Sequence, residues 1–79
     1  PAGALKSGRD GMDAVRVLLR EAPRYLEPEG LLVVEVGNTE ARVRREFPRL
    51  PFLWLEFARG GGGVFLLTAG QLRRGRAGR

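Results

Sequence analysis

Cysteine and histidine are both absent from the 79 residues of this chain. Without cysteine there are no disulfides, no thiolate metal ligands and no cysteine nucleophile. Without histidine the chain lacks the commonest general base and the commonest metal ligand. We therefore predict no metal site. We also expect a core this small, with neither cross-link nor metal, to be only marginally stable by itself.

Long apolar runs are missing as well. No segment approaches the ~20 residues of a membrane span. The first residues, Pro-Ala-Gly-Ala, lack the charged and apolar regions of a signal peptide. We therefore expect a cytoplasmic protein without a membrane partner.

The positive charge is concentrated at one end of the sequence. The chain carries 14 basic and 9 acidic residues, a net charge of +5. Four of the arginines fall within residues 73–79, which leaves 10 basic residues against 9 acidic ones. We predict that residues 73–79 are a disordered, solvated tail. Contact of this tail with RNA phosphates is the alternative, less favoured because no aromatic residue stands among the arginines to stack on bases.

A helix is predicted near the start of the chain. Residues 1–9 are small and polar, and we expect a loop or a linker remnant there. Asp10 is a good N-cap, and Asp13 adds negative charge to the first turn. The apolar residues that follow are three and four apart, which predicts one buried face. They are Met12, Val15, Leu19, Ala22 and Leu26. Pro23 lacks a backbone N–H and predicts a kink or an early end.

Three segments have the character of strands. Leu31–Val36 is apolar except for Glu35, which is typical of a strand buried on both faces. Phe52–Phe57 and Val64–Thr68 flank Gly60–Gly63, where glycine permits the positive φ angles of a hairpin loop. Since the strands are apolar on both faces, we expect helices to cover both sides of the sheet.

A second helix is predicted from Glu40 to about Phe47. Asn38 or Thr39 would be its N-cap. The strand–helix–strand unit should form a right-handed crossover with parallel outer strands. The last strand would return antiparallel between them, and residues 69–72 would form one terminal helical turn. The predicted fold class is α/β: a three-stranded mixed sheet with two helices and a terminal β-hairpin.

Three segments, in the same order along the chain, carry a resemblance to a known enzyme family. They are Ser7–Arg16 (Ser-Gly-Arg-Asp-Gly-Met-Asp-Ala-Val-Arg), Glu35–Asn38 (Glu-Val-Gly-Asn) and Phe47–Phe57 with the Gly-Gly-Val-Phe-Leu-Leu-Thr that follows. The first resembles the segment after the catalytic motif of the HemK-like protein-glutamine methyltransferases, and the second resembles their fifth strand and its exit. The third is most similar to the branch that modifies a large-subunit ribosomal protein. The resemblance covers nearly all of residues 5–72.

The resemblance implies that residues 10–72 are the C-terminal part of a class I, Rossmann-like methyltransferase. Such an enzyme transfers a methyl group from S-adenosylmethionine to the side-chain amide nitrogen of a glutamine in a ribosomal protein. The family holds its cofactor with a glycine-rich loop after the first strand, and the glutamine amide with an Asn-Pro-Pro-Tyr motif. Neither occurs here. Gly60–Gly63 lies inside a predicted hairpin and not at a helix N-terminus, where anions bind. We therefore assign no catalytic and no cofactor-binding residue, and we expect the chain alone to be inactive.

Four residues are candidates for the border of the substrate cleft: Asp10, Gly11, Glu35 and Asn38. The first two fall in the segment that resembles the one after the catalytic motif. The last two stand near the end of a strand, where ligands gather in open α/β sheets. Each has a structural alternative. Asp10 and Asn38 would be helix caps and Gly11 the small neighbour of a cap. Glu35 would be a buried carboxylate satisfied by a backbone amide or an arginine.

Two other functions stay open at this point. A small basic α/β module would bind RNA with an affinity that falls steeply with salt. A structural or dimerisation module would act through the outer edge of the Leu31–Val36 strand, which is apolar and lacks a partner strand in the predicted sheet. For a methyltransferase fragment the same edge predicts self-association or domain swapping.

Overall fold

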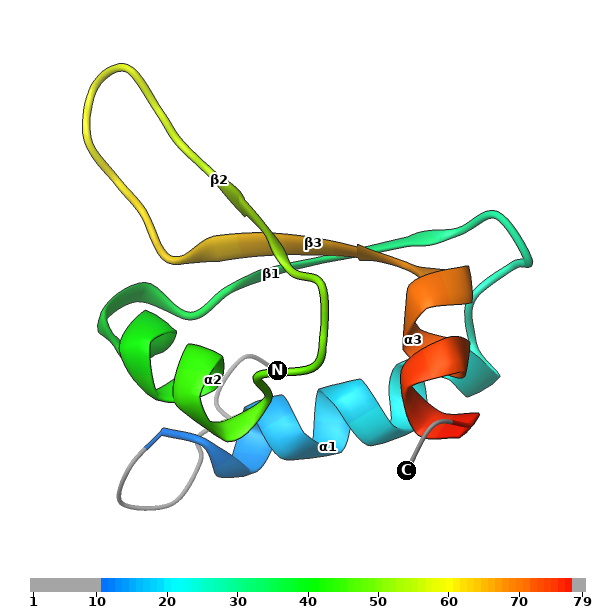
Figure 1. The fold of residues 1–79 in the computed structure, drawn as a ribbon. Coiled ribbons are helices and arrows are strands. Elements are labelled where there is room, and N and C mark those ends of the chain that lie inside the picture. The colour runs from blue at the N-terminus through cyan, green and yellow to red at the C-terminus, as the bar shows by residue number, and fades with distance from the viewer. Residues whose placement is uncertain (1–10, 78–79) are drawn as a thin grey trace.

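A computed structural model describes residues 11–77 of the chain. In chain order the elements are α1 (Asp13–Glu21), β1 (Leu31–Glu35), α2 (Glu40–Glu46), β2 (Leu53–Leu55), β3 (Val64–Thr68) and α3 (Ala69–Ala77). Short 3₁₀ turns occupy Ala22–Arg24 and Gly37–Thr39. Figure 1 shows two layers, with the sheet on one side and the three helices on the other. The α/β class predicted from the sequence is confirmed.

The apolar stripe predicted for the first helix is buried. Met12, Val15 and Leu19 are 0%, 4% and 6% exposed, and Ala22 and Leu26 pack against the same core. This face of α1 therefore supplies the layer beneath the sheet, as its spacing of three and four residues indicates.

One end of α1 agrees with the prediction and the other does not. Pro23 ends the helix early, as expected, because α1 stops at Glu21 and a 3₁₀ turn with proline in its first turn follows. The start is later than predicted: the first helical residue is Asp13, and Met12 occupies the N-cap position without a side-chain cap. Asp10, the expected N-cap, lies outside the described residues.

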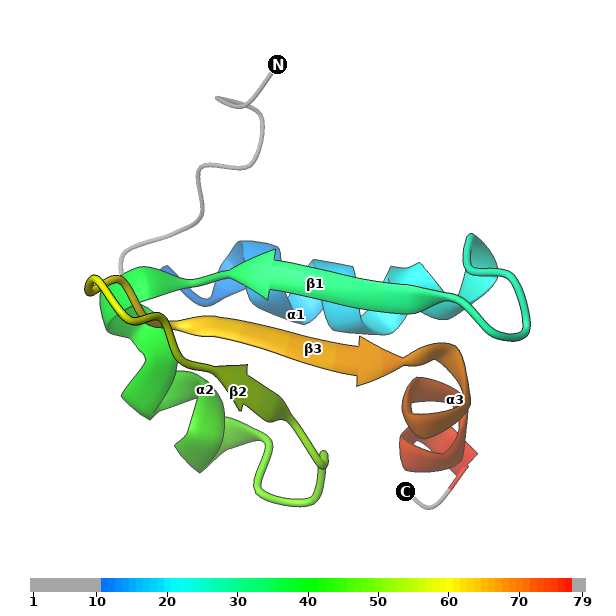
Figure 2. The same ribbon diagram turned by 90° about the horizontal axis from the view of Figure 1, so that it is seen from above.

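The strand order is β1-β3-β2, and Figure 2 shows β3 between the other two strands. β3 pairs antiparallel with β1, where Val33 lies opposite Leu66, and antiparallel with β2, where Leu53 lies opposite the same Leu66. The predicted insertion of the last strand between the others is confirmed. The prediction of a mixed sheet is wrong, because both hydrogen-bonded strand pairs are antiparallel. β1 and β2 run in the same direction, as predicted, but they are not neighbours.

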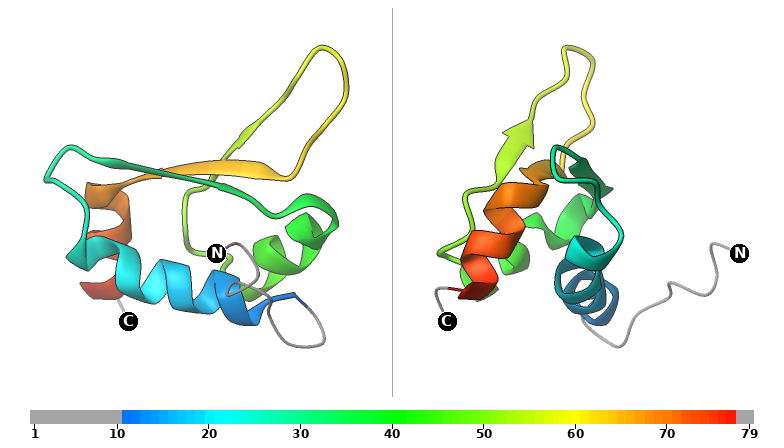
Figure 3. Two further views of the ribbon diagram at one scale, coloured as in Figure 1. Left: turned by 180° about the vertical axis from the view of Figure 1, so that it is seen from behind. Right: turned by 90° about the vertical axis from the view of Figure 1, so that its right-hand side faces the viewer.

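Within residues 11–77, helices cover only one face of the sheet. On the helix side Phe65 and Leu67 of β3 are fully buried. On the other side Leu31, Val33 and Leu53 are 54%, 54% and 57% exposed. The prediction of burial on both faces is wrong for this chain, because all three helices of the described part lie on the same side, as two further views confirm (Figure 3). We call the uncovered side the open face; its apolar residues are Leu31, Val33, Leu53, Leu55, Val64 and Leu66.

The predicted second helix is present from Glu40 to Glu46, with Val43 fully buried and Phe47 packed on the core. Its capping differs from the prediction. Thr39 stands at the N-cap position but makes no side-chain cap hydrogen bond, and the 3₁₀ turn that contains Asn38 leads into the helix instead.

The last helix is longer than the single turn predicted for residues 69–72. It begins with a capping box: the Gln71 backbone N–H donates to Thr68 Oγ1 at 3.0 Å, and the Thr68 N–H donates to Gln71 Oε1 at 2.9 Å. α3 then continues to Ala77. The prediction of a disordered tail from residue 73 therefore differs from the structure, in which the chain is helical as far as Ala77.

Arg73 shows what holds this helix in place. Its guanidinium donates to the backbone carbonyl oxygens of Pro23 and Leu26 at 2.8 and 2.9 Å. These carbonyls lie at and after the end of the helical segment, where backbone acceptors lack helical partners. Arg73, which we predicted to be part of a solvated tail, thus joins α3 to the end of α1.

Candidate functional site

The candidate cleft residues that the structure describes belong to one end of the molecule. Glu35 is the last residue of β1, and Asn38 lies in the turn after it. Gly11 comes shortly before α1, and the start of α1 lies at the same end as the exit of β1 (Figures 1 and 2). The three described candidates therefore lie toward the same end of the molecule, with Glu35 in the sheet and Gly11 in the helix layer. The fourth candidate, Asp10, falls outside the described residues.

The structural roles predicted as alternatives, a buried carboxylate for Glu35 and a helix cap for Asn38, are not found. Glu35 is exposed on the open face, opposite Val64 in the register, so the prediction of a buried carboxylate that needs a partner is wrong. Asn38 is exposed and caps no helix through its side chain. Gly11 has a φ of +74°, a conformation that favours glycine over other residues.

The glycine loop, Gly60–Gly63, makes backbone hydrogen bonds at this same end of the molecule. The carbonyl oxygen of Gly63 accepts hydrogen bonds from the backbone N–H of Val36 at 2.6 Å and of Gly37 at 3.2 Å. Gly63 and Gly37 both have positive φ, +68° and +56°. The end of the hairpin therefore closes against the exit of β1 by glycine-to-glycine backbone contact. The Gly63 carbonyl occupies the first N–H of the 3₁₀ turn that leads into α2.

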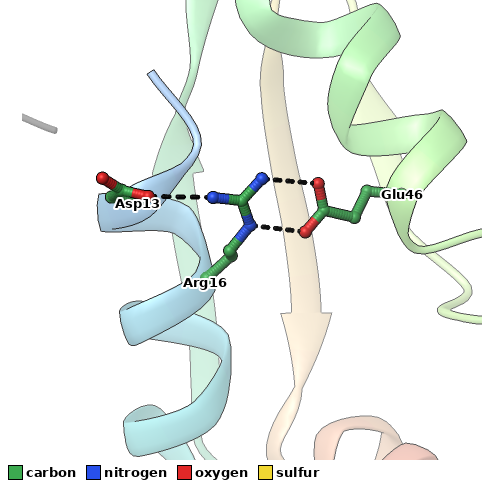
Figure 4. A network of polar contacts seen from close by, with 3 residues as sticks. All are labelled: Asp13, Arg16 and Glu46. Carbon is green, nitrogen blue, oxygen red and sulfur yellow. Dashed lines mark hydrogen bonds and ion pairs between the residues drawn. The ribbon is translucent and has the colours of Figure 1, made fainter. Parts of the chain in front are cut away.

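A charged network ties α1 to α2. The Arg16 guanidinium contacts both carboxylate oxygens of Glu46, Nε to Oε2 at 2.6 Å and Nη2 to Oε1 at 2.9 Å, and its Nη1 contacts Asp13 at 2.8 Å. Figure 4 shows Arg16 reaching between the two carboxylates. Such a bidentate fork fixes the relative position of two elements. Asp13 and Arg16, both in the first resembling segment, thus have a structural role.

No group of three or more acidic residues in 11–77 is placed to hold a metal ion, and no polar or charged side chain described there is buried. The ion pairs with Arg20 and Arg24 hold the pKa of Glu21 below its ordinary value. Glu21 lies at the far end of α1 from the candidate cleft residues, so this shift marks a surface ion pair and not a proton-transfer group.

The chain is similar in sequence to curated methyltransferases. The particular proteins are named ribosomal protein uL3 glutamine methyltransferase. Those of Neisseria gonorrhoeae and Neisseria meningitidis serogroup A are each 49% identical over 72 residues, which is 91% of this chain and 24% of each relative. The protein of Francisella tularensis is 44% identical over 91% of this chain and 23% of its own length. The chain thus spans about a quarter of the length of these relatives.

The resemblance stated from the sequence is confirmed by these relatives, whose printed names specify glutamine methylation of a ribosomal protein. No protein-family model matches the chain. No solved structure matches it significantly. Within residues 11–77, no helix combines the length and the apolar character needed to cross a membrane.

Proposed function

We propose that this chain is the C-terminal part of a cytoplasmic S-adenosylmethionine-dependent methyltransferase that methylates the side-chain amide of a glutamine in ribosomal protein uL3. The chain by itself is inactive in this proposal. Its contribution is structural: it supplies the last strands of the catalytic domain and the helices that support them.

The observation that carries the proposal is the 49% identity to proteins of that name across 91% of this chain. The matched stretch of 72 residues includes all the elements from α1 to β3, so the match is not confined to a local motif. The relatives are about four times as long. The methyltransferase motifs that this sequence lacks, the glycine-rich cofactor loop and Asn-Pro-Pro-Tyr, are therefore proposed to lie in the remainder of a longer protein.

The open face supports the proposal that this chain packs against the remainder of a longer protein. Val33, Leu66 and Leu53 lie in one row across the three strands, and the two outer members of the row are more than half exposed. Burial of such side chains contributes roughly 1.5–3 kcal/mol each. A face of this kind is stable when another layer covers it, and we propose that the remainder of the enzyme provides that layer.

The outer edge of β1 supports the same conclusion. β1 is an edge strand in the order β1-β3-β2, with no partner strand among the described residues on its far side. An unpaired edge of five mainly apolar residues is a template for another strand. We propose that a strand of the longer protein pairs there, and that the isolated chain uses the same edge and face to associate with itself.

The residues present do not fit S-adenosylmethionine. Gly60, Gly61 and Gly63 turn a hairpin, and the backbone of Gly63 is engaged with Val36 and Gly37. No other glycine-rich loop precedes a helix in residues 11–77. The cofactor therefore belongs, in this proposal, to the missing portion, and residues at the exit of β1, Glu35 and Asn38 among them, border the substrate cleft.

A chimaeric enzyme tests the proposal. The part of the Neisseria gonorrhoeae relative that matches this chain is replaced by this chain, and transfer of a labelled methyl group from S-adenosylmethionine to uL3 is measured. We expect the chimaera to methylate uL3. The relative truncated before the matching part, and this chain alone, should both show no transfer above background.

A folded chimaera without activity, checked by circular dichroism, would contradict the proposed role of these residues. Methylation of uL3 by this chain alone would contradict the proposed inactivity. Activity of the truncated relative would show that the segment is dispensable for the reaction and would also oppose the proposal.

A further inference from the structure

A groove on the helix side of the molecule has no place in the function proposed above. It is lined by α1, by α3 and by the connection from α2 to β2. The floor is apolar: Leu19 and Leu72 are almost fully buried, and Phe47 and Leu50 are half-buried beside them. α3 and the connection after α2 approach closely at Gly75, where a Cβ would lie 2.7 Å from Cδ2 of Leu50.

The rim of the groove is cationic. Four arginines line it, Arg16, Arg20, Arg49 and Arg74, against a single acidic residue, Glu46. Glu46 is occupied by its bidentate contact with Arg16, and Arg20 contacts Glu21. The rim therefore carries an excess of positive charge that the groove's own residues do not neutralise.

Arg49 and Arg74 are the two arginines available to a ligand. Both are exposed, and neither makes an ion pair or a hydrogen bond with any residue in the described part of the chain. They come from different elements, the connection after α2 and the helix α3. A guanidinium presents a planar fork that matches a carboxylate, so two carboxylates of one ligand can be held across the groove.

We propose that this groove binds an acidic peptide segment with apolar side chains. Its carboxylates pair with Arg49 and Arg74, and its apolar side chains cover the floor between Leu19 and Leu50. A mixed surface of this kind, with an apolar centre and a charged rim, is the ordinary anatomy of a protein–peptide contact. Charge complementarity selects an acidic partner over a basic one.

The lining argues for peptide over single-stranded RNA. Binding of single strands depends on aromatic side chains that stack with bases. The one aromatic residue of this groove, Phe47, is half-buried and packs into the core. The rest of the floor consists of aliphatic and proline side chains, which suit apolar peptide residues.

The groove and the open face are separate surfaces. The groove is built by the helices and the connection beside them, whereas the open face belongs to the opposite side of the sheet (Figure 3). Covering of the open face by the remainder of an enzyme or by a second copy would leave the groove accessible. The proposal therefore does not depend on the function proposed for the chain.

Fluorescence anisotropy with the full chain tests the proposal. The probe is a short dye-labelled peptide in which glutamate and leucine alternate. Three comparison ligands share its length: one with lysine for glutamate, one with serine for leucine, and an oligouridylate RNA. We expect measurable binding of the glutamate–leucine peptide, weaker binding of the serine form and no binding of the lysine form.

Charge reversal at the rim supplies the structural part of the test. Each variant is checked for an unchanged circular dichroism spectrum, because the substituted arginines are exposed. Arg49→Glu should weaken binding of the peptide by roughly three- to tenfold, and Arg49→Glu with Arg74→Glu by roughly tenfold or more. Arg59→Glu is the matched control: Arg59 is also an exposed loop arginine without a partner in the described chain, but it lies outside the groove. It should change the affinity less than about twofold.

Three results would overturn the proposal. The first is absence of binding to the glutamate–leucine peptide at low salt. The second is an equal loss of affinity for Arg59→Glu and Arg49→Glu, which would show attraction to overall charge only. The third is tighter binding of the RNA, lost on reversal of Arg49 and Arg74, which would assign the groove to nucleic acid.

Discussion

Gly63 is a position where the residue type follows from the backbone. Its φ is +68°, and a Cβ built there would lie 2.6 Å from the Cα of Gly37. We expect Gly63→Ala to destabilise the chain by about 1–3 kcal/mol, since both the strained backbone and the contact are unfavourable. The neighbour Gly62 has open space around it and no positive φ, so Gly62→Ala should be within about 0.5 kcal/mol of the wild type. Chemical denaturation of both variants measures the difference, and equal stabilities would contradict this account.

The Arg16–Glu46 contact joins two helices through one pair of side chains. The two side chains are 40% and 36% exposed, so water screens part of their attraction. We expect a double-mutant cycle of Arg16→Ala and Glu46→Ala to give a coupling free energy of about 0.5–1 kcal/mol at low ionic strength, decreasing as salt is added. A coupling of zero at low salt would mean that the fork in Figure 4 does not stabilise the fold.

At the residue scale the sequence is a good guide to apolar positions and a poor one to polar partners. The burial of Met12, Leu19 and Val43 follows from their spacing alone. The contacts of Arg16 and Arg73 join residues 30 and 47 or more positions apart. No local pattern predicts them, because they depend on how the helices lie in space.

The capping box decides where the last helix begins. Thr68 and Gln71 exchange two hydrogen bonds at the junction of β3 and α3. We expect Thr68→Ala to cost about 1 kcal/mol of unfolding free energy and to lower the helical circular dichroism signal, whereas Thr68→Ser retains the hydroxyl and most of the stability. If Ser and Ala at this position are equally destabilising, the hydroxyl is not the cause.

At the element scale the sequence predicts the order of the strands, but it predicts a shorter last helix than the observed α3. The hairpin predicts that β3 pairs with β2, and the crossover leaves room for β3 between β2 and β1, which is the order observed. The Thr-x-x-Gln pattern at 68–71 is a readable start signal for a helix, but the high arginine content after it favoured a solvated tail. The sequence does not show that Arg73 donates hydrogen bonds to two backbone carbonyls after α1, and these bonds help to hold the helix in place.

For the whole molecule, the open face predicts association of the isolated chain. In light scattering at rising concentration we expect an average mass above the monomer mass of 8.7 kDa. Val33→Lys should shift the distribution toward the monomer, because a charge on the open face resists burial. Val17→Lys is the control, since Val17 is a similarly exposed valine on α1. A wild-type chain that stays a single monomeric species at high concentration would contradict the prediction.

The burial of the strands shows what sequence patterns report at this scale. β1 and β3 are apolar on both faces, which is the pattern of strands covered on two sides. The helices described here cover one side only, and Leu31 and Val33 are more than half exposed. In the longer protein proposed above, the open face is the surface that the remainder would cover.

The nucleotide sequence immediately upstream of the codon for Pro1 tests the central claim most directly. If the chain is the C-terminal part of a uL3 glutamine methyltransferase, an in-frame extension encodes a glycine-rich loop after a strand and then Asn-Pro-Pro-Tyr. A start codon at that position, with no such extension upstream, would leave a freestanding small domain and contradict the claim.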